Sequence, residues 1–331
     1  MSLPYFDRLD YVSTIVQENV FCLSVDKLKK INYSSINLIT RTIFDELTRI
    51  LNHLLAIACH ALDVGSMSTI FWSFEEREKI MEFYERFSGA RMHTAIYKPF
   101  IFQKIIISSL RKDILFFNKN FFITSNEIHN VLTNNKVWKN RLINIGFITI
   151  NNVFSSNLTG VMARSVGFKK DLRLNIFQTY NNYKYINFNS FFSFNGDSYD
   201  RYLLRMYEMI ESINIVTQCI LSLKNLKNTK KNNVINFFRN KYMESIITHF
   251  KYWSTGFVLK TNLIFCTVES PKGEFSINLF SDNTEKPYRC KIKSPSYNNL
   301  QFMKYLTKNT FLPDLVTLIG TIDIVFGEID R

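Results

Sequence analysis

The chain of 331 residues is 46% hydrophobic and 21% charged, which allows a sizeable buried core and excludes disorder along its whole length. Its net charge of +13 would suit a protein that binds nucleic acid or a membrane surface. Phe, Ile, Asn and Lys are abundant while Gly and Pro are scarce, and this pattern favours AT-rich codon usage as the origin of the charge. The five cysteines contain no C-x-x-C pair and are odd in number, which argues against a metal site and a disulfide framework and favours reduced thiols inside a cell.

The first third of the chain predicts three helices. The first covers residues 7–20, the second covers residues 36–62 and carries a continuous apolar face, and the third covers residues 69–88. Gly65 follows the second helix, where a residue in the left-handed conformation commonly ends a helix.

The middle of the chain is less regular. Residues 96–124 are apolar and aromatic without a clean period, so no element is assigned there, and residues 145–195 predict loops and short strands. Helices are predicted at residues 125–132, 137–142, 199–224 and 242–252, with a polar surface loop at residues 225–233.

The pattern changes to strands near the C-terminus. Strands are predicted at residues 263–268, 274–280 and 288–292, followed by a helix at residues 313–319 and a tail. No uncharged apolar run of about 18 residues is present, so we expect no membrane span. The expected fold is mainly α with a small C-terminal antiparallel β element in a single domain, residues 1–331. Its parts are a helical core at 1–95, a small sheet at 260–295, and a C-terminal helix and tail at 313–331.

General catalytic motifs are absent from the sequence. It contains no P-loop, dinucleotide fingerprint or nucleophile elbow, and its histidines lack the spacing of zinc ligands. Arg8 and Tyr11 are three residues apart on the predicted helix 7–20 and would share a face, as would His60 and Asp63 near the end of helix 36–62. Such pairs are more often structural than functional, and a tyrosine like Tyr11 is more often half-buried packing. These features alone indicate a basic, mostly helical domain.

Longer strings are more specific. Residues 4–13, PYFDRLDYVS, resemble the start of the helical core in the NADH dehydrogenase subunit 7, or 49 kDa-type, family of respiratory complex I, and similar blocks follow in order. These blocks are residues 46–53, 60–65, 74–79, 83–93, 132–135, 160–164, 171–173, 196–203, 243–245, 249–251, 269–275, 287–293 and 326–331. So many collinear blocks leave little room for coincidence.

The resemblance implies a fold like that of the nickel–iron hydrogenase large subunit, with the old metal cavity turned into a quinone pocket. The hydrogenase tail reads D-P-C-x-x-C-x-x-H, and the same stretch here is residues 323–331. Val325 and Glu328 stand where thiolate ligands would, so no nickel–iron centre can form by that scheme. We therefore expect no metal to be ligated by this chain.

The resemblance also implies roles for four residues. Tyr11 matches the tyrosine whose hydroxyl donates a hydrogen bond to a quinone carbonyl and can supply a proton, and Asp63 matches the aspartate that orients a second donor, a histidine. Arg8 and His93 match residues beside the terminal [4Fe-4S] cluster, which a neighbouring subunit holds. A fixed cation there raises the cluster's potential, and a histidine can couple proton uptake to reduction.

The implied function is that of a core subunit of proton-translocating NADH:ubiquinone oxidoreductase, with ubiquinone as substrate. The implied partners are the terminal-cluster subunit, the 30 kDa-type subunit and the membrane-arm quinone-channel subunit, and no nucleic acid. The implied place is the matrix side of the mitochondrial inner membrane, and the lack of a transit-like segment after Met1 favours a mitochondrial gene. The alternative is a non-catalytic scaffold remnant of the peripheral arm, against which the retention of all four site residues argues.

Two departures from the family pattern affect the site. The family's N-terminal section, with a β-hairpin and a His-Pro-Ser-Thr-His-Gly loop, has no counterpart before Pro4, so we expect a separate polypeptide to supply it in trans. After His93 the family's Arg-Pro-Gly-Gly-Val is replaced by Lys-Pro-Phe-Ile-Phe at residues 98–102. The loss of two glycines changes the backbone freedom of this loop.

Overall fold

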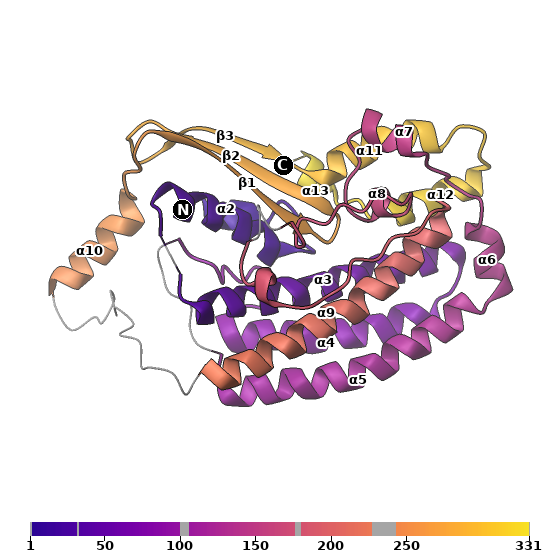
Figure 1. Ribbon diagram of the computed structural model, residues 1–331, viewed down its shortest axis with the longest axis horizontal. Helices are drawn as coiled ribbons and strands as arrows, with labels where there is room; N and C mark the ends of the chain where they lie inside the picture. The colour runs from indigo at the N-terminus through magenta and orange to yellow at the C-terminus, as the bar shows by residue number, and fades with distance from the viewer. Residues whose placement is uncertain (1, 32, 100–105, 176–179, 227–242, 331) are drawn as a thin grey trace.

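Four long helices form the body of the computed structural model, which describes the chain except residues 1, 32, 100–105, 176–179, 227–242 and 331. These helices are α3 (Ser35–Val64), α4 (Ser68–Ser88), α5 (Ser108–Thr133) and α9 (Ser198–Leu226). Figure 1 shows them side by side, and α3 packs against both α9 and α4. Most residues of α3 are buried, so this helix is the centre of the fold.

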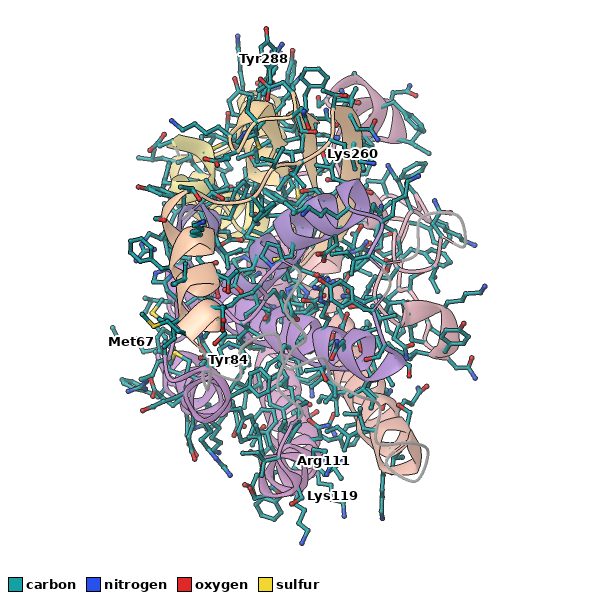
Figure 2. All side chains as sticks on the ribbon, turned by 90° about the vertical axis from the view of Figure 1, so that its left-hand side faces the viewer. Met67, Tyr84, Arg111, Lys119, Lys260 and Tyr288 are labelled. Atoms are coloured by element: carbon teal, nitrogen blue, oxygen red, sulfur yellow. The ribbon has the colours of Figure 1, made fainter. Side chains whose placement is uncertain are left out.

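A three-stranded antiparallel sheet covers the other side of the core. Its strands are β1 (Asn262–Ser270), β2 (Gly273–Ser281) and β3 (Pro287–Lys293), in that order. Side chains two positions apart on β1 and β2 point into the core, because alternate residues of a strand share a face; they are Cys266, Val268, Phe275, Ile277 and Leu279. Helix α2 (Thr14–Leu28) packs against both of these strands. In Figure 2 the sheet end with Lys260 and Tyr288 lies opposite α5 with Arg111 and Lys119.

Shorter elements complete the domain. They are α1 (Leu3–Asp7), α6 (Lys136–Leu142), α7 (Ile150–Ser155), α8 (Val161–Arg164), a 3-10 turn (Tyr183–Tyr185), α10 (Met243–Ser254), α11 (Pro295–Leu306), α12 (Leu312–Ile322) and α13 (Phe326–Asp330). A second, smaller core includes Ile148, Val153, Phe302 and Leu318, so it joins α7, α11 and α12. Among the described residues, no helix is both long enough and apolar enough to cross a membrane.

Most of the periodic segments are confirmed. The helices predicted at 36–62, 69–88, 137–142, 199–224 and 242–252, the strands at 263–268, 274–280 and 288–292, and the helix at 313–319 all correspond to elements of the structure. Gly65 has φ +108°, as a left-handed helix end requires. Residue 242 and most of the predicted loops at 98–102 and 225–233 lie outside the described residues.

The helix predicted at residues 7–20 is confirmed from residue 14 onward but is wrong over residues 8–13, because the chain leaves α1 after Asp7 and enters α2 only at Thr14. The Asp10 carboxylate accepts hydrogen bonds from the backbone N–H of Val12 (3.1 Å) and from Ser13. An aspartate that bonds the backbone just ahead of it offers an alternative to helical bonding. Arg8 and Tyr11 therefore do not share the face of a helix.

The structure differs from the sequence-based expectation at three further places. Residues 108–133 form the single helix α5, although residues up to 124 were unassigned and 125–132 were predicted as a separate short helix. Exposed apolar residues such as Phe116, Phe122 and Ile123 obscure the buried stripe of α5 in the sequence. Among the described residues between 145 and 195 there are short helices and no strands, and α11 had not been predicted.

Buried ion pairs fix α3 against its neighbours. Arg164 donates to Glu208 of α9 (2.7 Å) and to Glu269 of β1 (2.8 Å). Glu46 of α3 accepts from Arg173 (3.2 Å) and sits in the same network through Arg49 (3.3 Å). Burial alone would raise the pKa of Glu208, but Arg164 and the other nearby cations hold it well below its ordinary value. This network joins helix, helix and sheet through charges that cannot be left unpaired.

Removing one cation from this network should destabilise the fold strongly. Arg164→Met leaves Glu208 and Glu269 short of a partner in a water-free site, and we expect a loss of about 3–5 kcal/mol in the free energy of unfolding, measured by denaturant titration. The matched control is Arg141→Met, which breaks a partly exposed pair with Asp314 and should cost about 1 kcal/mol or less. Equal losses of unfolding free energy in the two variants would contradict the stabilising role of the network.

Candidate functional site

A buried ion pair holds the loop that carries Tyr11. The Nζ atom of Lys272, in the turn between β1 and β2, lies 2.8 Å from an oxygen of Asp10, and both side chains are fully buried. Because Asp10 also bonds Val12 and Ser13, the residues after Tyr11 are fixed from both sides. Tyr11 itself is 46% exposed, and its hydroxyl has no hydrogen-bond partner among the described residues.

The C-terminal tail packs against the same loop. A Cβ atom added to Gly327 of α13 would lie 3.0 Å from the Leu9 carbonyl oxygen and 3.4 Å from Cδ1 of Tyr11, so a larger residue would push the loop away. The neighbouring Glu328 is buried and accepts a hydrogen bond from the Ser296 hydroxyl. Burial, and then the charge of Asp10, raise the pKa of Glu328 to about 8, so its carboxyl is neutral at pH 7.

A shallow, mostly apolar hollow surrounds Tyr11. Its lining residues are Tyr11, Val12, Thr14, Leu51, Arg77, Met81, Tyr84, Arg91 and Met92. The accessible space is only about 10 Å³, which is about one water molecule. The described residues thus provide one wall of a site rather than an enclosed cavity.

Asp63 lies on the same helix as Leu51 but not beside Tyr11. Twelve residues separate Leu51 from Asp63, which corresponds to roughly 18 Å along a helix axis. Partial burial raises the pKa of the Asp63 carboxyl. Cys59 interacts electrostatically with Asp63 and also with Arg77, which lines the Tyr11 hollow. The structure therefore places Asp63 at the end of α3, outside the hollow that Tyr11 lines.

His60 is not a partner of Asp63. Its ring is buried and packs against the Trp138 ring with 4.9 Å between centroids. Burial, followed by the fields of two arginines, lowers the pKa of His60 to about 3, so the ring stays neutral. The structural interpretation of His60 is therefore confirmed.

Arg8 and His93 meet around a residue that the sequence did not single out. Arg8 is exposed and donates to the Pro4 carbonyl oxygen (2.7 Å), while His93 is half-buried beyond the end of α4. Both act electrostatically on Asp7, which is buried at the end of α1. Asp10 was likewise not predicted, and the signal for both aspartates in the sequence was that they belong to the PYFDRLDYVS string.

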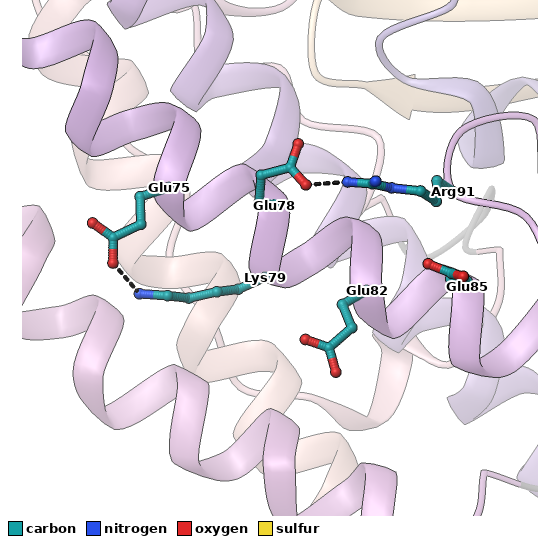
Figure 3. A pocket seen from close by; sticks show the side chains of 6 residues that line it. All are labelled: Glu75, Glu78, Lys79, Glu82, Glu85 and Arg91. Carbon is teal, nitrogen blue, oxygen red and sulfur yellow. Dashed lines mark hydrogen bonds and ion pairs between the residues drawn. The ribbon is translucent and has the colours of Figure 1, made fainter.

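A second surface hollow is a different kind of site. It lies along the outer face of α4 and is lined by Glu75, Glu78, Lys79, Glu82, Glu85 and Arg91 (Figure 3). Lys79 pairs with Glu75 at 3.0 Å and Arg86 with Glu82 at 3.8 Å, as their four-residue spacing predicts. This exposed, charged surface does not suit a neutral apolar ligand. Among the described residues, no three His, Cys, Asp or Glu side chains are grouped to hold a metal ion.

Comparison with known proteins decides the family. The family described as "Respiratory-chain NADH dehydrogenase, 49 Kd subunit" matches residues 63–331. The chain belongs to this 49 kDa subunit family. It is 56% identical over 345 residues to the NADH-ubiquinone oxidoreductase 49 kDa subunit of Paramecium tetraurelia, covering 100% of this chain and 86% of that protein. The subunits of the same name from Acanthamoeba castellanii and Reclinomonas americana are 47% and 42% identical, with 100% of this chain and 83% and 84% of theirs covered.

Membership confirms the predicted family. As a 49 kDa subunit the chain is part of respiratory complex I, an oxidoreductase assembly, and its partners are the other subunits of that complex. It has the mainly helical architecture with a small antiparallel sheet that was expected.

The stability of this 49 kDa subunit should depend on pH through the buried Glu328 in its C-terminal tail. Because folding raises the pKa of Glu328 from 4.5 to about 8, the folded chain binds an extra proton between these values, and stability falls as pH rises through that window. Glu328→Gln keeps a neutral hydrogen-bonding group. We expect the thermal midpoint of the variant, relative to the natural chain, to increase from pH 5 to pH 8.5. A constant difference, as expected for the exposed control Glu82→Gln, would contradict the assignment.

Proposed function

We propose that the chain forms part of the quinone-reduction site of proton-translocating NADH:ubiquinone oxidoreductase, next to a terminal [4Fe-4S] cluster held by a neighbouring subunit. The observation that supports this proposal is the placement of Tyr11. Its side chain is partly exposed and its hydroxyl has no hydrogen-bond partner among the described residues, while its loop is fixed by a buried ion pair. The relatives are named as subunits of an NADH-ubiquinone oxidoreductase, which supplies the substrate class.

The wall around Tyr11 suits a quinone headgroup. Leu51, Met81 and Met92 offer apolar surface to a flat ring, and the neutral phenol of Tyr11 can donate a hydrogen bond to a carbonyl oxygen. That bond strengthens as negative charge develops on the oxygen, and the same hydroxyl can then supply a proton. Because the hollow encloses only about 10 Å³, other subunits must provide the remaining walls.

Asp63 has a supporting role in this proposal. Its carboxylate is exposed at the end of α3, close to Gly320 of α12, where it can accept a hydrogen bond from a group of another chain. A carboxylate that accepts from one nitrogen of a histidine fixes its ring so that the other nitrogen faces the quinone.

Arg8 and His93 would face the cluster. The cluster supplies the electrons, and Arg8 is an exposed cation beside the Tyr11 loop, so its charge favours the reduced form of a nearby centre. His93 is half-buried and can bind a proton when the local negative charge increases.

The proposal extends to the fold and its surroundings. Residues 1–331 would form one domain like the hydrogenase large subunit, and Val325 and Glu328, both buried, would occupy the place of the lost metal ligands. The chain would contact the terminal-cluster, 30 kDa-type and quinone-channel subunits on the matrix side of the mitochondrial inner membrane. The energy of quinone reduction would drive proton translocation in the membrane arm.

Replacing Tyr11 by Phe tests the quinone role. Tyr11→Phe removes only the hydroxyl, and we expect NADH:quinone turnover of the assembled complex to fall by about a hundredfold at normal cluster content. The matched control is Tyr5→Phe, which removes a hydroxyl from a side chain 76% exposed on α1 and should leave turnover unchanged. Full turnover in Tyr11→Phe would refute the role and favour the scaffold alternative.

Replacing Arg8 by Met tests the place of the cluster. Loss of the fixed cation should lower the midpoint potential of the terminal cluster, measured by redox titration with electron paramagnetic resonance. Arg86→Met, which removes an exposed cation of α4, is the control and should leave the potential where it was. Identical shifts in both variants would argue against a position of Arg8 beside the cluster.

A further inference from the structure

A buried cation beside Tyr11 has no part in the proposed function so far. We propose that the Arg77 guanidinium is a second donor of the quinone site, which stabilises the negative charge that reduction places on the quinone oxygen bonded by Tyr11. The inference rests on the proposed function, since it takes the hollow around Tyr11 as the place where the headgroup binds. It adds a catalytic residue from α4 to a site built around a single phenol.

Arg77 lacks the partner that a buried cation normally has. Its side chain is 8% exposed, yet its guanidinium forms no hydrogen bond and no ion pair within the described part of the chain. An arginine keeps its positive charge at neutral pH, so this charge lies in the wall of the hollow with no carboxylate in contact. Buried arginines that do donate to a carboxylate or a carbonyl oxygen are Arg41, Arg49, Arg164, Arg173, Arg201 and Arg205.

Two polar side chains of the hollow remain free to bind a ligand. Among the described residues that line it, the Tyr11 hydroxyl and the Arg77 guanidinium have no hydrogen-bond partner. The other polar side chains are bonded within the chain, and these pairs are Thr14 with the Met92 carbonyl oxygen, Tyr84 with Thr48, and Arg91 with Glu78. The accessible space of about 10 Å³ holds one oxygen atom, so both free donors would meet the same acceptor.

The Phe74 ring limits where the guanidinium can lie. Cζ of Arg77 is 5.0 Å from the centroid of this ring, which is three residues earlier on α4. A cation over an aromatic ring is attracted by the ring's quadrupole, but the ring supplies no acceptor oxygen. The N–H groups of Arg77 are therefore held in place and still available to a ligand, as a preorganised donor must be.

The charge of Arg77 matters most when the quinone is reduced. A neutral carbonyl oxygen is a modest acceptor, whereas the same oxygen accepts strongly once electrons from the neighbouring cluster have entered the ring. Arg77 does not release a proton, so it acts through its charge, and the phenol of Tyr11 supplies the proton. An interaction that strengthens as charge develops increases the rate of the chemical step and leaves quinone binding nearly unchanged.

Steady-state kinetics of the assembled complex test this role. Arg77→Met removes the charge from a side chain of similar length, and we expect kcat with ubiquinone to fall by about a hundredfold while KM changes less than about threefold. Arg77→Lys keeps a cation and should recover about tenfold of that loss. The matched control is Arg111→Met, which removes a buried cation of α5 that also lacks a partner among the described residues but lies outside the hollow. Its kcat and KM should stay unchanged.

A series of quinones separates charge stabilisation from packing. Electron-withdrawing substituents already stabilise a negative oxygen, so the loss of kcat in Arg77→Met should shrink from electron-rich to electron-poor quinones. An equal loss for every quinone, or full turnover at normal cluster content, would overturn the proposal. So would a low yield of complex with normal turnover per complex, because Arg77 would then pair with a carboxylate of a neighbouring subunit. If Arg77→Met does not assemble, Arg77→Gln carries both measurements.

Tyr11→Phe distinguishes failure of this inference from failure of the proposed function. If the quinone binds elsewhere, Tyr11→Phe and Arg77→Met both keep full turnover. If only the inference fails, Tyr11→Phe loses turnover and Arg77→Met does not. If both hold, the double variant should lose less than the product of the two single losses, because the two donors act on one oxygen. Losses that multiply would refute the shared oxygen.

Discussion

Charged and polar side chains buried along α3 constrain the rest of the structure. Glu46, Arg49 and His53 lie in the interior of this helix, where water cannot stabilise them, so each needs a partner at a fixed place. Arg49 donates to the Glu269 carbonyl oxygen (2.7 Å), and His53 lies 3.0 Å from Glu208. A shift of α9 or of β1 by one residue would break these pairs. Hydrophobic packing holds the elements together, while the buried charges select a single register.

A buried ion pair also fixes the proposed site, and it is formed by Asp10 and Lys272. The pair lies between the N-terminal loop and the turn of the sheet, and both of its members are shielded from water. A loop held in this way can present Tyr11 at the surface without the loss of order that an exposed loop usually has. Rigid placement of one hydroxyl is what a site needs when its other walls come from different chains.

A feature of the fold could be predicted when neighbouring residues determine it, and could not when residues distant in the sequence determine it. The helices α3, α4 and α9 and the three strands were predictable because their apolar periods are local. The break at residues 8–13 was not, because Asp10 is stabilised there by Lys272, which is 262 residues away in the sequence. The candidate residues Tyr11, Asp63, Arg8 and His93 came from resemblance rather than from spacing. The burial of Asp7 was missed because an acidic residue in an amphipathic segment is usually solvated, and only the folded chain reveals its burial.

The contact of Gly327 with the Tyr11 loop has a consequence for biosynthesis. Tyr11 leaves the ribosome well before Lys272 and Gly327, which fix its loop and follow it by more than 250 residues in the sequence. The Tyr11 loop therefore lacks its stabilising contacts while the helices between Tyr11 and Lys272 can already pack. A product that stops short of Lys272 would keep much of the helical body and lack an ordered site. The arrangement makes order in the Tyr11 loop depend on synthesis of the segments that carry Lys272 and Gly327.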